Sequence, residues 1–307
     1  MNNTRNYVIS YRNPDTDGAA CSIALAELLT ISENQRYDPV LLGNINEETA
    51  FVLNYAGIDF APVPFCAEDA SSVVVVDTHH RSQLPDDFPF HKVRLVVDHH
   101  SGGDDHLFEN ALVDNRPIGA AASIVAEMYF DRGCLKKNML TMLGFAILSN
   151  TLNFSAPSTS DFDAKMFQKI TDLYPLPDKS VAAMFAKRAA VLQQGLHAAL
   201  LSDFKKFETK RADVGISQLE IYDLQAHIAI HEIPSILRQI AEEQGLKYCM
   251  FNGVDLKTKT SIVICADPQT AALAGEIFHT DFPESGYGHT FDRILLRKTD
   301  FIPALNR

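Results

Sequence analysis

The chain has 307 residues, of which 46% are hydrophobic and 21% are charged, and its net charge at pH 7 is -12. Beyond roughly 250 residues a chain commonly forms more than one core, so we expect two domains. The negative charge repels nucleic-acid backbones, which excludes long nucleic acid as a partner but not a small anionic substrate. No apolar run approaches the roughly 20 residues that a membrane-spanning helix needs, so we expect no membrane partner.

The N-terminal segment MNNTRNYVISY contains no apolar core of a signal peptide. The five cysteines are odd in number and form no CxxC pair. This spacing indicates neither a disulfide framework nor a thiolate zinc site. We therefore expect a cytoplasmic protein.

The first half of the chain alternates short β-rich runs with helical patterns. We predict strands at 7–11, 40–42, 71–76 and 93–97, and helices at 18–30, 47–55, 118–131, 137–148 and 161–174. The runs SSVVVV and VRLVV are largely apolar, as in parallel strands that are buried on both faces. The pattern predicts an α/β domain with a doubly wound, mainly parallel sheet.

The second half begins after the segment YPLPDKS (174–180), whose prolines end the preceding helical pattern. One long helix is expected over 181–201. Strands and helices then follow in the order β, β, α, β, β, α, at 204–209, 214–220, 234–244, 248–252, 261–265 and 270–278. We expect a smaller mixed α/β domain, with domain limits at 1–188 and 189–307 and the active site in the cleft between the domains.

Polar residues follow three of the predicted strands. Asn13-Pro14-Asp15-Thr16-Asp17 comes after the first strand, Asp77 after VVVV, and Asp98-His99-His100 after LVV. Ligands bind at the carboxyl ends of strands in open α/β sheets, and closely spaced carboxylates suit hard cations. The simpler interpretation is a helix cap at the first group and ordinary loop residues at the others. A fourth polar group, SNTLNF (149–154), lies between two predicted helices.

The order NPDTD, Asp77, VDHH and ILSNTLNFSAPST resembles the DHH phosphoesterase superfamily and, within it, the manganese-dependent family II inorganic pyrophosphatases. The second half continues this resemblance. LLSDFKKFE (200–208) and VGISQLE (214–220) are similar to the start of that family's C-terminal domain, and LLRKTDFIPAL (295–305) is similar to its phosphate-binding segment. The resemblance spans nearly the whole chain.

The resemblance implies a role for each matching residue. Metal ligands would be Asp15, Asp17, Asp77, His99 and, at the fourth motif, Asn150. Asp98 would support the ligands, and His100, Lys205, Arg297 and Lys298 would contact the phosphates. Asp77, Asp98 and His100 would thus act in catalysis. The resemblance also implies Mn²⁺ or Mg²⁺, one or two ions, and a homodimer formed through the N-terminal domain.

Two positions depart from the family pattern. Tyr11 stands where these enzymes carry a histidine, and Asn150 stands where they carry a metal-binding aspartate. A phenol with a pKa of about 10 is a poor ligand at pH 7, and an asparagine carbonyl supplies no negative charge. We expect one tightly bound ion, with a second arriving with the substrate. His79 or His80 could replace the missing imidazole or could be structurally inert.

The leading function is hydrolysis of inorganic pyrophosphate to phosphate by metal-activated water. One alternative is a phosphodiesterase or phosphatase that acts on a small nucleotide or a short oligonucleotide. GYGH (286–289) motivates it, because this segment resembles a glycine-rich segment of another DHH branch. The simpler interpretation of GYGH is a turn before a final strand. A third alternative is a catalytically weakened homologue that binds a phosphorylated ligand, as the departures at Tyr11 and Asn150 suggest.

Overall fold

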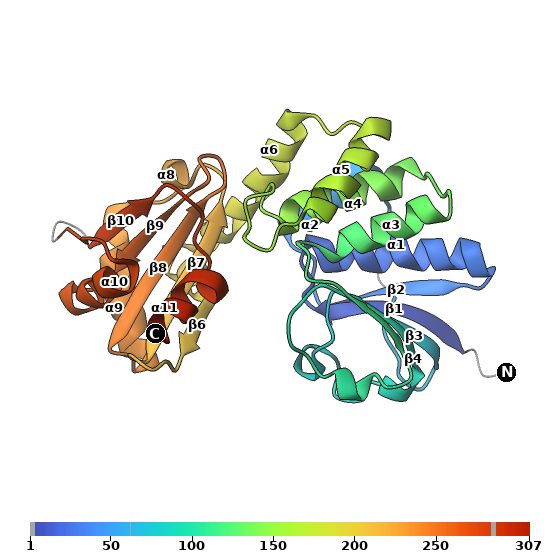
Figure 1. Cartoon of the computed structure of the whole chain (residues 1–307), viewed down its shortest axis with the longest axis horizontal. Coiled ribbons are helices and arrows are strands. Elements are labelled where there is room, and N and C mark those ends of the chain that lie inside the picture. Colours follow the sequence, from blue (N-terminus) through green and yellow to red (C-terminus); the bar gives the residue numbers. More distant parts are fainter. Residues whose placement is uncertain (1–3, 62, 284–286) are drawn as a thin grey trace. The chain divides into compact units, whose positions relative to one another are not determined.

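The protein is described by a computed structural model over residues 4–61, 63–283 and 287–307. The chain divides into two compact units, Met1–Met184 and Phe185–Arg307 (Figure 1). Among the described helices, none combines the length and apolar character that crossing a membrane requires. Residues 1–3 of the N-terminal segment and Gly286 of GYGH lie outside the described residues.

The first unit contains a parallel sheet of five strands in the order β2-β1-β3-β4-β5. This is an order of the doubly wound class, in which the switch point lies between β1 and β3. The strands are β1 (Arg5–Arg12), β2 (Tyr37–Leu42), β3 (Ala70–Val76), β4 (Val93–Asp98) and β5 (Leu112–Asn115).

Long helices cover one face of this sheet (Figure 1). Helices α1 (Thr16–Glu33) and α3 (Ala121–Asp131) contact the strands. Helices α2 (Glu47–Ala56), α4 (Lys137–Asn150) and α5 (Asp161–Leu173) pack against α1, α3 or one another, and α6 (Asp178–Ala186) follows them in the chain. The other face carries short 3-10 turns, η1 (Arg81–Gln83), η2 (Phe90–Lys92) and η3 (Asp105–Leu107). Side chains beside these turns pack on the apolar strands and close the core, notably Leu84, Phe88 and Phe108.

The second unit contains a mixed sheet in the order β10-β9-β8-β7-β6. Among the described strands, β7 and β8 are parallel and the other neighbouring pairs are antiparallel. The strands are β6 (Phe204–Phe207), β7 (Val214–Ile221), β8 (Tyr248–Asp255), β9 (Thr260–Cys265) and β10 (Gly288–Phe291). Helices α7 (Leu196–Ser202), α8 (Leu224–His227) and α9 (Ile233–Gln244) pack on one face, and α10 (Pro268–Phe278) and α11 (Ile302–Leu305) on the other. The predicted fold class is confirmed, with a parallel sheet in the first unit and a mixed sheet in the second.

The prediction of one long helix over 181–201 is wrong. Helix α6 ends at Ala186, a 3-10 segment η4 covers Lys187–Gln194, and α7 starts after Gly195. Gly195 has φ +90°, a conformation that glycine adopts readily and that a continuous helix cannot contain. Two further elements were not predicted: β5, which is short and exposes Leu112, and a π-helical turn, η6 (Arg297–Phe301), at the predicted phosphate-binding segment.

Candidate metal centre

Three of the predicted metal-binding acids, Asp15, Asp17 and Asp77, gather where β1 and β3 end, at the switch point of the sheet. Asp15 precedes α1, and its Oδ1 accepts hydrogen bonds from the N–H groups of Asp17 (2.9 Å) and Gly18 (3.1 Å). A Cβ atom on Gly18 would lie 2.4 Å from Ser10 Oγ and 3.1 Å from Asp77 Oδ2. Glycine therefore lets the start of α1 approach both strand ends closely.

Asp77 follows β3 with φ +58°, a left-handed conformation that costs free energy for a residue other than glycine. Its side chain is buried, and Oδ1 accepts no hydrogen bond of acceptable geometry among the described residues. His99 Nε2 lies 3.2 Å from this oxygen, within ion-pair distance. Burial raises the pKa of Asp77 well above its usual value, and the nearby Asp17 adds to the rise. The site thus contains a buried carboxylate oxygen without a full partner.

Asp17 is buried within the first turn of α1 and is already surrounded by donors. Its two oxygens accept the N–H groups of Ala121 and Ala122 (2.8 Å each), the Asn150 amide (3.1 Å) and the Cys21 thiol (3.5 Å). Asp17 therefore caps α3 across the fold. Burial raises the pKa of Asp17 to about 6, although His99 opposes the rise.

His99 faces these acids through Nε2, while Nδ1 lies 3.0 Å from the carbonyl of Ile118. Burial opposes its protonation, but Asp77 and Asp17 outweigh burial and raise the pKa of His99 to about 10. The Asn150 amide nitrogen lies 3.1 Å from His99 Nε2, 3.1 Å from Asp17 Oδ2 and 2.9 Å from the Gly119 carbonyl. The two amide hydrogens of Asn150 can serve Asp17 and the Gly119 carbonyl, so His99 Nε2, once it loses its proton, could bind a cation without leaving Asn150 unsatisfied.

Asp98 forms hydrogen bonds with the imidazole rings of His79 and His100. One oxygen accepts from His100 Nδ1 (2.8 Å) and from the N–H of His99 (2.7 Å), and the other bonds His79 Nδ1. Burial alone would raise the pKa of Asp98, but its hydrogen bonds to His100 and His79 outweigh burial and lower it to about 2. A carboxylate in this position orients rings that face a ligand.

The structure therefore brings together a subset of the predicted residues. Asp77, Asp98, His99 and His100 each offer a donor atom, and these atoms lie within 4.8 Å of one another. Asp15 and Asp17 adjoin them at the start of α1. This donor set, with one partly unsatisfied carboxylate and an imidazole, fits a divalent cation such as Mn²⁺ or Mg²⁺.

The structure also shows the surroundings of Tyr11, which departs from the family pattern, and of the two histidines that could replace the missing imidazole. The Tyr11 hydroxyl accepts the N–H of Asp15 (3.1 Å), and burial, followed by repulsion from Asp15 and Asp77, raises the Tyr11 pKa well above its usual value. Tyr11 thus remains a neutral phenol. His79 bonds the Asp98 oxygen that His100 does not contact, and the His80 ring stacks on His79 with centroids 5.3 Å apart. Among the described residues, neither joins the group of donor atoms.

The predicted phosphate ligands lie in the second unit, near one edge of its sheet. Lys205 is exposed on β6 opposite Ile216 of β7, and Lys298 is exposed in η6. Arg297 is 7% exposed, and three of its five N–H donors are used by the Ile216 carbonyl, the Asp203 carbonyl and the Asp203 carboxylate. Two of the three cations are thus accessible, and the third is held within the fold.

Sequence reasoning missed Glu48 of α2. Its buried carboxylate accepts the Thr16 hydroxyl (3.0 Å) and the Ser149 hydroxyl, which ties together α1, α2 and α4 beside the candidate metal ligands. In the sequence, Glu48 is one of two acids in the first turn of a helix and carries no other signal.

Two family profiles together match most of the chain. Residues 5–147 match the DHH family, N-terminal domain, and residues 182–307 match the DHHA2 domain. The chain belongs to the DHH phosphoesterase superfamily. It is 27% identical to a manganese-dependent inorganic pyrophosphatase of Methanocaldococcus jannaschii over 98% of both chains. It is 29% identical to one of Methanothrix thermoacetophila over 97% of this chain and 96% of the other.

Solved structures agree with this DHH assignment. A putative family II inorganic pyrophosphatase of Methanococcus jannaschii superimposes with a TM-score of 0.71 at 26% identity, covering 98% of each chain. An exopolyphosphatase-related protein of Bacteroides fragilis shares the fold, with a TM-score of 0.50 at 13% identity, covering 98% of this chain and 91% of the other. Likeness over both domains supports a DHH phosphohydrolase that uses a divalent metal.

Proposed function

We propose that this chain hydrolyses inorganic pyrophosphate to phosphate with Mn²⁺ or Mg²⁺. The observation that carries the proposal is the group formed by Asp77, His99, His100 and Asp98 at the carboxyl ends of β3 and β4. Its buried Asp77 oxygen accepts no hydrogen bond among the described residues, and its carboxylates adjoin those of Asp15 and Asp17. The full-length similarity to manganese-dependent inorganic pyrophosphatases supports the choice of substrate.

In this proposal Asp15, Asp17, Asp77 and His99 hold the metal. A bound divalent cation would supply a Lewis acid that makes water more acidic and offsets phosphoryl charge. Asp98 keeps the His99 and His100 rings in place, since it accepts both backbone N–H groups and the His100 ring N–H. His100 is about one-third exposed and can donate its second ring N–H to a phosphoryl oxygen.

The proposed phosphate ligands of the second unit are Lys205, Lys298 and Arg297. Lys205 and Lys298 are exposed and can each neutralise a phosphoryl oxygen as a point charge. Arg297 keeps its guanidinium on Asp203 and on two backbone carbonyls. We infer that Arg297 acts mainly by positioning Asp203 and β7, and that its remaining N–H donors can meet the substrate.

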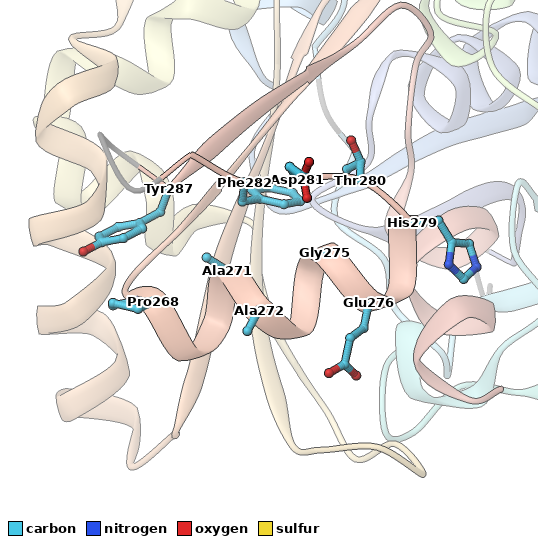
Figure 2. Close-up of a pocket in the computed structure, with 10 residues that line it drawn as sticks. All are labelled: Pro268, Ala271, Ala272, Gly275, Glu276, His279, Thr280, Asp281, Phe282 and Tyr287. Carbon is cyan, nitrogen blue, oxygen red and sulfur yellow. The ribbon is translucent and has the colours of Figure 1, made fainter.

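A nucleotide substrate has weaker support. Tyr287 lines a cavity with Phe282 beside α10 (Figure 2). However, Tyr287 immediately precedes β10, whereas Lys205 lies on β6, and these strands form opposite edges of a five-stranded sheet. Four strand spacings amount to about 19 Å, which is too far for one mononucleotide to place its base against Tyr287 and its phosphate on Lys205.

A homodimer formed through the first unit is part of the same proposal. Strand β5 forms one edge of the parallel sheet, and its Leu112 and Val113 side chains are 72% and 39% exposed. An exposed apolar edge strand is commonly covered by another chain. Light scattering after gel filtration should report a dimer for the wild type and a monomer for Leu112→Lys.

The decisive experiment is phosphate release from pyrophosphate by metal-stripped protein titrated with Mn²⁺ and Mg²⁺. We expect metal-dependent release that Asp77→Asn abolishes and that Asp87→Asn, a change at an exposed acid, leaves intact. A dinucleotide is assayed in parallel. Preferential release of mononucleotide would replace pyrophosphate as the substrate, and metal binding without turnover of either substrate would favour the ligand-binding homologue.

A further inference from the structure

A cavity in the first unit lies away from the candidate metal centre. Its volume is about 680 Å³, within the range of roughly 300–1,000 Å³ that is common for ligand sites. The C-terminal ends of α2 and α5 and the N-terminal end of α4 form its walls. Helix α4 starts here at Lys137 and ends at Asn150 in the metal centre. A helix of this length separates the two sites by about 20 Å.

The charge of this cavity is unusual for the chain. Lys136 and Lys137 line it, and none of the lining residues is acidic, although the net charge of the protein is -12. Lys136 pairs with Glu27 at 2.9 Å, whereas Lys137 makes no ion pair with any described residue. The cavity of about 740 Å³ beside α10 has the opposite character, since Glu276 and Asp281 line it without a lysine or arginine (Figure 2). Only the first of these two cavities favours an anion.

The hydrogen-bond donors of the cavity agree with its charge. The residue before α4, Lys136, provides no side-chain cap, and Asn138 Oδ1 accepts the Met139 N–H (3.0 Å), so the positive end of the helix dipole is capped only in part. Thr141 lines the cavity, is 6% exposed, and its hydroxyl makes no hydrogen bond within the described part of the chain. The hydroxyls of Thr30 and Thr151, by contrast, bond the carbonyl four residues earlier. The Thr141 hydroxyl at the cavity wall is therefore available to bond a ligand atom.

Two tyrosines provide the apolar part of the cavity. The Tyr174 hydroxyl donates to the Leu135 carbonyl (2.6 Å), and the Tyr55 ring meets Phe145 edge-on with centroids 5.0 Å apart. Both rings are therefore held in place before a ligand arrives. Fixed aromatic rings bind planar bases at low entropic cost.

We propose that this cavity binds a nucleoside diphosphate, with its phosphates at Lys137 and Thr141 and its base against Tyr55 and Tyr174. The site is separate from the proposed pyrophosphate site and does not depend on the reaction catalysed there. Its ligand contacts Lys137 and Thr141 of α4, which lie outside the candidate metal centre.

The proposal is tested by calorimetric titration of the metal-free protein with ADP. Lys137→Glu should weaken ADP binding by about tenfold or more, because it removes a charged donor and adds a like charge. The matched control is Lys165→Glu, a charge reversal at an exposed position of α5, which should bind as the wild type does. Thr141→Val preserves the side-chain shape and should weaken binding to a lesser extent.

Further measurements separate this site from the substrate site. The double variant Lys205→Ala/Lys298→Ala should retain ADP binding, and inorganic phosphate should bind the wild type more weakly than ADP. Unchanged affinity in both Lys137→Glu and Thr141→Val would overturn the proposal. Loss of ADP binding in the Lys205→Ala/Lys298→Ala variant would place ADP on the second unit, and equal affinity for phosphate would remove the nucleoside from the assignment.

Discussion

The candidate metal centre of the first unit and the predicted phosphate ligands of the second unit hold buried charge in opposite ways. Asp17 and Asp77 are buried acids whose pKa values are raised, so ionising them costs free energy in the absence of a cation. Arg297 is also buried, but Asp203 and two backbone carbonyls already satisfy much of its guanidinium group. The buried acids of the first unit therefore lack a compensating cation, whereas the buried arginine of the second unit already has its partners.

This difference predicts distinct consequences of mutation. Removing a carboxylate charge from the candidate metal centre should preserve or raise the stability of the metal-free fold. The same change should abolish metal-dependent phosphate release. Removing Arg297 should weaken the fold, because its partners lose their donors. Exposed Lys205 and Lys298 belong to neither case, since they can be removed with little effect on the fold.

The largest expected effect is that of Asp77→Asn. Asparagine tolerates the left-handed conformation at this position, so the change removes charge without backbone strain. Loss of the metal's contribution should reduce metal-dependent phosphate release by about 10³-fold or more. The metal-free variant should unfold at a temperature equal to or above that of the wild type. Lower stability together with retained turnover would reverse the comparison, and Asp87→Asn serves as the exposed control.

The arrangement at the strand ends could be predicted from sequence because parallel strands share an edge. Asp15 follows β1, Asp77 follows β3 and the DHH triplet begins at the last residue of β4, so the strand order alone places them together. The apolar runs of β3 and β4 reveal these strands without tertiary information. The positions of Lys205 and Lys298 on the surface likewise follow from residue type.

The supporting contacts could not be predicted, because they join residues that are distant in sequence. Asp17 caps α3, whose first residue lies 104 positions later, and no local capping signal reveals this. The second imidazole on Asp98 belongs to His79, and a Cβ atom on Gly103 would lie 2.0 Å from that ring. Such contacts depend on tertiary packing, and so do the hydrogen bonds of Arg297.

The second prediction concerns Arg297→Ala. The variant strips donors from the Ile216 carbonyl and from Asp203, whose carboxylate is 43% exposed and therefore partly solvated. We expect the second unit to lose about 2 kcal/mol of stability, less than for a fully buried pair. Hydrogen exchange of the β6 and β7 amides measures this loss. Lys298→Ala should leave exchange unchanged and raise KM, and identical exchange in both variants would contradict a structural role for Arg297.

The third prediction uses Asn150→Asp. The new carboxylate cannot donate to Asp17 Oδ2 or to the Gly119 carbonyl, and it adds negative charge 3.1 Å from Asp17. The metal-free protein should therefore lose stability, while its affinity for Mn²⁺ should rise by about tenfold. Electron paramagnetic resonance of free Mn²⁺ during titration measures the affinity. Asn150→Leu loses the same donors without adding charge, so it should lose stability without gaining affinity; a gain in Asn150→Leu would exclude the charge as the cause.

The smallest expected effect is a pH dependence of metal stabilisation. The folded-state pKa of Asp17, about 6, lies above its usual value, so the metal-free fold loses stability as pH rises from about 4 to about 6. The His99 pKa of about 10 is also raised, and the stability that protonated His99 contributes is lost as pH rises from about 6.5 to about 10. Metal binding requires ionised Asp17 and neutral His99 Nε2, so protons compete with the cation at both groups. The rise in unfolding temperature on adding Mn²⁺ should therefore grow between pH 5.5 and 7.5, and the ionisation of Asp17 alone accounts for about 1 kcal/mol of this growth. Thermal unfolding in EDTA and in Mn²⁺ across this range measures it, and a constant increment would show that neither group binds the metal.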